Sequence, residues 1–214
     1  MVYTFTYLPN KKFLTLEDPS VQSLLRKWSM LGRLTCQAFA FDQEFNAYQM
    51  EQFLKDFVRG SARQRPWRWR WPIPYTGKDG IYVYYHHKKY IYIQVLVEEG
   101  GELWEVLQKE EREQLLVRLF RLVVLGGECC QFEDNIHHYL AVTRTLYRDL
   151  VTPMVEDGRV VVRSVAAQVS VMAADGVTVP EKPTHSQNIL LLVVNPHTRT
   201  THTLLHQHGV GDLD

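Results

Sequence analysis

Residues 189–206, ILLLVVNPHTRTTHTLLH, decide the fold, because they hold two β-prone runs with a turn between them. The first run, 189–194, is apolar throughout, and Asn195 and Pro196 separate it from the second run, 200–206. Short β-prone runs bounded by Gly, Pro and Asn are typical of antiparallel strands. The last third of the chain holds three more such runs: 159–162, 166–172 and 177–179. This part of the sequence therefore predicts an antiparallel meander.

Helical spacing of apolar residues dominates the chain before residue 157. It predicts four main helices, which begin at Asp18-Pro19-Ser20, at Asp42, near Glu102 and near Glu133. The first uses proline in its opening turn. The second ends at Gly60 and has Phe45, Tyr48, Phe53 and Phe57 on its apolar side, with Asp42 and Glu44 at its positive end. The third ends at Gly126-Gly127 and the fourth at Thr152-Pro153.

The remaining elements are strands, and together they predict an α+β fold with about four helices packed on a largely antiparallel sheet. Tyr3, Phe5 and Tyr7 alternate with threonines in an opening strand, and 81–85 and 90–97 form a hairpin around His86-His87-Lys88-Lys89. We expect one domain, 1–214. A weak boundary near residue 157 separates a helix-rich part, 1–157, from a β-rich part, 158–214.

Composition indicates an intracellular globular protein. The 214 residues are 45% hydrophobic and 22% charged, and the formal net charge is zero. Three cysteines, two of them adjacent, do not form a disulfide framework, so we expect reduced thiols and a cytoplasmic or nuclear location. The opening residues lack the charged and apolar regions of a signal peptide. No apolar run approaches the roughly 18 residues of a membrane span.

An unusual feature is the segment 63–72, RQRPWRWRWP, which alternates arginine with tryptophan between prolines. From Arg59 to Lys89 the chain has eight basic residues against one acid, Asp79. The prolines exclude a helix and favour extended backbone, so indoles and guanidinium groups lie on opposite sides. The segment therefore predicts a cationic, aromatic surface element. We predict these binding residues: Arg59, Arg63, Arg65, Trp67, Arg68, Trp69, Arg70, Trp71, Lys88 and Lys89.

The leading hypothesis is a non-enzymatic binding or assembly protein, comparable to a scaffold, a viral matrix-like protein or an accessory subunit. Its Arg/Trp segment, defined for docking as residues 59–71, would dock on an anionic surface, either membrane or nucleic acid, or on a protein partner. An alternative is a protein-interaction or self-association module with the tryptophans at the interface. The same spacing also fits a half-buried strand whose indoles pack into the core.

A third alternative is a metal-dependent hydrolase that uses the C-terminal histidines His197, His202, His206 and His208. In a strand, the last three of these share one face, which is a workable arrangement for metal ligands. The sequence supplies no further ligand motif, and the nearby carboxylates Asp212 and Asp214 lie at the chain end. We therefore interpret the histidines as solvated, and expect no metal, no cofactor and no catalytic residue.

Overall fold

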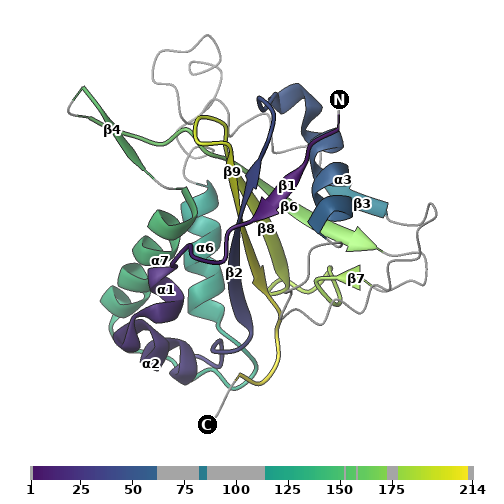
Figure 1. Cartoon of the computed structure of the whole chain (residues 1–214). Coiled ribbons are helices and arrows are strands. Elements are labelled where there is room, and N and C mark those ends of the chain that lie inside the picture. The colour runs from purple at the N-terminus through teal and green to yellow at the C-terminus, as the bar shows by residue number, and fades with distance from the viewer. Residues whose placement is uncertain are drawn as a thin grey trace.

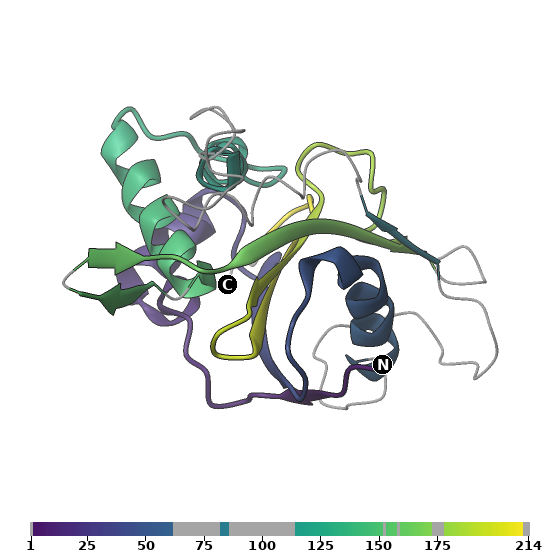
Figure 2. The same cartoon turned by 90° about the horizontal axis from the view of Figure 1, so that it is seen from above.

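The computed structural model describes residues 2–61, 82–85, 114–151, 153–157, 159–172 and 178–211. These residues form a curled antiparallel sheet with helices on both faces (Figures 1 and 2). The predicted α+β class is confirmed, although the sheet is more prominent than expected. The expected strand at 90–97 and the expected helix start near Glu102 lie outside the described residues.

The main sheet consists of antiparallel neighbours in the order β1-β2-β9-β8-β6-β3. Its strands are β1 (Phe5–Tyr7), β2 (Leu34–Phe41), β9 (Thr200–His206), β8 (Ile189–Asn195), β6 (Val165–Met172) and β3 (Tyr82–Tyr85). A short strand, β7 (Thr178–Val179), also pairs with β6. Two further strands, β4 (Met154–Glu156) and β5 (Arg159–Val161), form a separate ribbon.

The stretch 189–206 lies at the centre of this sheet. Its two runs pair as the predicted hairpin, with Ile189 opposite His206 and Asn195 opposite Thr200. On its other side β9 pairs with β2, which was not predicted, and β2 in turn pairs with β1. Strands from both sides of residue 157 therefore share one sheet, and the single-domain organisation stays a prediction.

Helices cover the two faces of the sheet unequally (Figure 2). One face packs against four helices: α1 (Leu14–Glu17), α2 (Pro19–Lys27), α6 (Gln114–Leu125) and α7 (Ile136–Val151). The other face packs against α3 (Met50–Ser61), whose phenylalanines join the aromatic residues of β1 and β2 in a second core. Alternate residues of the central strands supply the two cores, as period-two geometry requires.

Two predicted helix boundaries are confirmed and have clear local causes. The Asp18 carboxylate accepts the backbone N–H of Ser20 at 2.8 Å and caps α2, whose first residue is Pro19. The helix α6 ends before Gly126, which takes a left-handed φ of 61°. A Cβ on the next residue, Gly127, would lie 2.1 Å from the Ser29 carbonyl oxygen, so this approach of two turns requires glycine.

Candidate functional site

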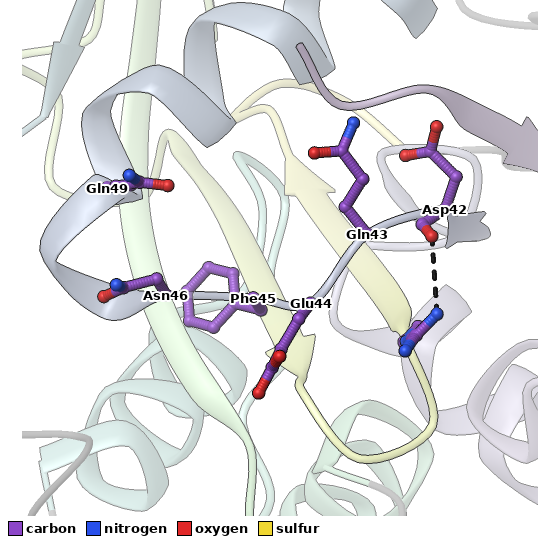
Figure 3. Close-up of a pocket in the computed structure, with 7 residues that line it drawn as sticks. Asp42, Gln43, Glu44, Phe45, Asn46 and Gln49 are labelled. Atoms are coloured by element: carbon purple, nitrogen blue, oxygen red, sulfur yellow. Dashed lines mark hydrogen bonds between the residues drawn. The ribbon is translucent and has the colours of Figure 1, made fainter. Parts of the chain in front are cut away.

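A cleft of about 920 Å³ lies where β2 leads into α3 (Figure 3). It is lined by Asp42, Gln43, Glu44, Phe45, Asn46 and Gln49, together with Arg199 from the turn between β8 and β9. Apart from Phe45, these residues are polar or charged, so the cleft presents carboxylates, side-chain amides and one guanidinium group. Such a lining suits a ligand that is itself polar.

Phe45 anchors the floor of the cleft. It is 8% exposed, and its ring lies 5.1 Å from that of Phe53 and 6.5 Å from that of Phe41. The Tyr3 hydroxyl donates a hydrogen bond to the Glu44 carbonyl oxygen at 3.1 Å. These contacts hold the loop backbone against the aromatic core beneath α3.

Asn46 determines the direction of the next residues. Its Oδ1 accepts the backbone N–H of Tyr48 at 3.0 Å and opens a 3-10 turn, η1 (Ala47–Gln49). The turn directs Tyr48 outward, so that 90% of this residue is exposed. Met50, where α3 begins, points back into the core. The cleft therefore has an exposed aromatic side chain on its neighbouring turn.

The charged groups of the cleft are only partly engaged by the protein. Asp42 accepts the backbone N–H of Thr4 at 2.9 Å, and this hydrogen bond lowers the pKa of its carboxyl. Arg199 donates from Nη1 to the backbone carbonyl of Asp42 at 3.4 Å. Within the described ranges, neither Glu44 nor Arg199 takes part in an ion pair. Both groups remain available to a ligand.

This region corrects the predicted second helix. Strand β2 continues through Phe41, and the helix begins only at Met50. Asp42 and Glu44 are therefore loop residues and do not lie at a helix start. Tyr48 faces solvent instead of the predicted apolar side, because the 3-10 turn precedes the regular spacing of α3.

The predicted Arg/Trp element falls almost entirely outside the described residues. Arg59 alone is described, and it is exposed in the last turn of α3. This helix contacts β3, so the described residues on either side of 62–81 belong to neighbouring elements. The other predicted binding residues, Arg63, Arg65, Trp67, Arg68, Trp69, Arg70, Trp71, Lys88 and Lys89, lie outside the described ranges.

The C-terminal histidines are not all solvated, which corrects that interpretation. His202 is 4% exposed and His206 is 0% exposed, because both point from β9 into the core between sheet and helices. Each ring donates from Nδ1 to a backbone carbonyl, His202 to Leu150 at 2.7 Å and His206 to Gln187 at 2.6 Å. His197 is exposed in the turn before β9.

Burial lowers the pKa of both core histidines, that of His206 to about 4. The ring of His208 lies 4.5 Å from that of His185, beyond the end of β9. In the part of the chain that the structure describes, no group of three or more His, Cys, Asp or Glu residues is arranged to hold a metal ion. The histidine-based hydrolase therefore has no described metal centre.

Comparison with known proteins identifies the family of the chain. The sequence profile of cilia- and flagella-associated protein 300 matches residues 2–65 and 88–206, most of the chain. The chain belongs to the cilia- and flagella-associated protein 300 family. A family member from Paramecium tetraurelia is 28% identical over 229 residues, which cover 90% of this chain and 89% of the relative. Another from Chlamydomonas reinhardtii is 26% identical over 240 residues, covering 90% and 93%. No solved structure matches the chain.

The match to cilia- and flagella-associated protein 300 includes the whole cleft but only part of the Arg/Trp segment. All the residues that line the cleft lie within the matched ranges, whereas Trp67, Trp69 and Trp71 fall in the unmatched interval 66–87. The family gives no support to the viral matrix-like analogy, because the matched relatives come from Paramecium and Chlamydomonas. Among the helices of the described ranges, none has the length and apolar character needed to cross a membrane.

Proposed function

We propose that this chain is a non-enzymatic accessory protein of cilia or flagella that acts by binding other proteins. Its place in the cilia- and flagella-associated protein 300 family supports the ciliary assignment. The description of the family as cilia- and flagella-associated also supports a ciliary or cytoplasmic location. A protein partner is favoured over a membrane or a nucleic acid because the chain has a formal net charge of zero and neither ligand is implied by the family.

The non-enzymatic assignment rests on one observation, which is how the buried acidic and histidine side chains are hydrogen-bonded. Among the described acidic and histidine side chains, the buried ones are Asp56, Asp149, His202 and His206. Each hydrogen-bonds a backbone group from another part of the chain. Their backbone partners are the N–H groups of Tyr3 and Thr15 and the carbonyls of Leu150 and Gln187. These hydrogen bonds connect separate segments of the chain, which is a structural use of buried polar groups and supports the non-enzymatic assignment.

The docking element of this proposal is the Arg/Trp segment, 59–71, with Lys88 and Lys89. Arginine and tryptophan are the residue types most enriched in the energetic centres of protein interfaces. Its first residue, Arg59, is exposed at the end of α3. The helix α3 contacts β3, so Arg59 and the strand that precedes Lys88 and Lys89 belong to neighbouring elements of the described fold. We expect a partner to contact this edge of the fold.

Replacing Arg65, Arg68 and Arg70 with alanine is expected to weaken binding to a ciliary protein partner at least fivefold without unfolding the chain. Three exposed ion pairs together contribute on the order of 1–2 kcal/mol, and salt screens them. The first measurement is co-sedimentation of the purified chain with demembranated Chlamydomonas reinhardtii axonemes. The second is gel filtration of the chain with the soluble flagellar fraction. Both are made at low and at high salt.

The matched control is Arg26, Arg144 and Arg148 replaced together, three arginines of the described helices outside the segment. It should bind as the wild type does. Anionic vesicles and a single-stranded oligonucleotide serve as further probes, and preferential binding to either would replace the protein partner. Binding that is insensitive to both salt and the segment's arginines would reject the docking element. Light scattering of the wild type and Trp69→Ala tests self-association.

A further inference from the structure

Beyond the proposed function, we propose that the cleft between β2 and α3 is a second binding site, for an extended peptide segment with a basic side chain. The proposal rests on described residues alone and does not require the Arg/Trp segment. Three features of the cleft support it: unpaired charge, free amide groups and an exposed aromatic ring beside them.

Charge determines the kind of side chain that the cleft accepts. Asp42 and Glu44 supply two carboxylates, against one guanidinium group from Arg199. The hydrogen bond from Thr4 favours the ionised form of Asp42, and Glu44 is exposed. Arg199 is directed to a backbone carbonyl and neutralises neither carboxylate through an ion pair in the described chain. The net charge of the cleft is therefore negative, and charge complementarity favours a lysine or arginine side chain on the ligand.

Amide groups favour an extended peptide over a free cation. Gln49 and Asn46 are exposed on the same loop, and Figure 3 shows both on the side of Phe45 away from Asp42. A side-chain amide offers donors and an acceptor, as a peptide bond does. The Asn46 oxygen is engaged by Tyr48, which leaves its NH₂ group to donate to a ligand carbonyl. A peptide lying along the loop would meet carboxylates at one end and amides at the other.

Tyr48 adds the aromatic component. This tyrosine lies on the turn between Asn46 and Gln49 and is 90% exposed, so a guanidinium or ammonium group of the ligand can lie over its ring at the amide end of the cleft. The loop beneath is fixed by the packing of Phe45 and by the hydrogen bond from Tyr3 to Glu44. Because the backbone is held before binding, ligand association would order few residues of the protein.

The test is selection of random twelve-residue peptides displayed on phage against the whole chain, followed by calorimetry with synthetic copies of the enriched peptides. We expect enriched sequences to contain at least one lysine or arginine. Replacing that residue with glutamine should weaken binding at least tenfold, and so should Glu44→Lys in the protein. Tyr48→Ala should weaken binding about fivefold. The control Glu128→Lys reverses an exposed glutamate in the loop after α6 and should leave affinity unchanged.

Each other outcome overturns the peptide site. These are an absence of enriched peptides, enrichment without basic residues, and equal affinity for the wild type and Glu44→Lys. The chain with Arg65, Arg68 and Arg70 replaced by alanine should bind the selected peptides as tightly as the wild type. If that variant loses the peptides while Glu44→Lys retains them, the library has selected for the Arg/Trp segment and the cleft is not the site.

Discussion

Replacing Asp149 with alanine is expected to lower the free energy of unfolding by about 3 kcal/mol, because it leaves two buried donors without an acceptor. The Asp149 carboxylate accepts the backbone N–H and the hydroxyl of Thr15, at 2.8 and 2.7 Å. Thr15 is 0% exposed and Asp149 is 7% exposed, so water has little access to either group. In a chain of this length the loss corresponds to a fall of about 10 °C in Tm. Thermal unfolding followed by circular dichroism measures it.

Two further variants distinguish the contribution of the buried hydrogen bonds to stability from that of a carboxylate charge. Thr15→Val removes only the hydroxyl and should cost about 1 kcal/mol. Glu17→Ala, on the same short helix α1, removes an exposed acid that pairs with Lys12 at 3.8 Å, and should cost less than about 0.5 kcal/mol. If Glu17→Ala and Asp149→Ala destabilised the chain equally, the buried hydrogen bonds would not be the source of the effect.

The importance of Asp149 comes from its position at the end of α7. The last four carbonyls of a helix have no partner within the helix. Here the carbonyl of Leu150 accepts His202 Nδ1–H and that of Val151 accepts the Ser164 hydroxyl, each at 2.7 Å. Three consecutive residues thus connect α7 to α1, to the start of β6 and to the central strand β9. The end of α7 therefore joins one other helix to two strands of the sheet.

Sequence reasoning found the elements that a local signal marks. Asp18 followed by proline marks the start of α2, Gly126 ends α6, and the break at Asn195 and Pro196 defines the central hairpin. It missed β2, because the alternation of apolar and polar residues in 34–38 runs into the apolar stretch 38–41, and residues on both faces of the strand are buried. The partners of β2 are β1 and β9, and the pairing with β9 joins residues far apart in the chain.

The candidate cleft could not be predicted for the same reason. Asp42 meets Arg199 across 157 positions of sequence, which no local pattern indicates. The apolar spacing from Phe45 onward is typical of a helix, so the sequence places the acids Asp42 and Glu44 at a helix start. His202 and His206 looked solvated because they alternate with threonine and leucine near the chain end. Their burial depends on the helices α6 and α7, which pack on that side of the sheet, and on β2 and β8, which flank β9 within the sheet.

Acidification from pH 7 to pH 5 is expected to reduce the free energy of unfolding by about 2 kcal/mol through His206 alone. Burial lowers the pKa of His206 to about 4, electrostatic interactions with His208, Arg33 and His185 act in the same direction, and the hydrogen bond to Gln187 opposes them. The unfolded chain takes up this proton near pH 6.5, whereas the folded chain does so only near pH 4. The stabilisation is therefore complete above about pH 6.5 and is lost as the pH falls toward 4, by about 3 kcal/mol in total.

The variant His206→Asn isolates this contribution, since its amide can donate to the Gln187 carbonyl but does not titrate. At pH 7 the free energy of unfolding of this variant should be lower than that of the wild type. Between pH 7 and pH 5, its free energy of unfolding should fall by about 2 kcal/mol less than that of the wild type. His202 also has a lowered pKa and contributes in both proteins, so the difference between them belongs to His206. The control His197→Asn changes an exposed histidine and should keep the wild-type dependence. Urea unfolding at several pH values measures all three proteins, and parallel curves for the wild type and His206→Asn would mean that His206 titrates alike in the folded and unfolded chain.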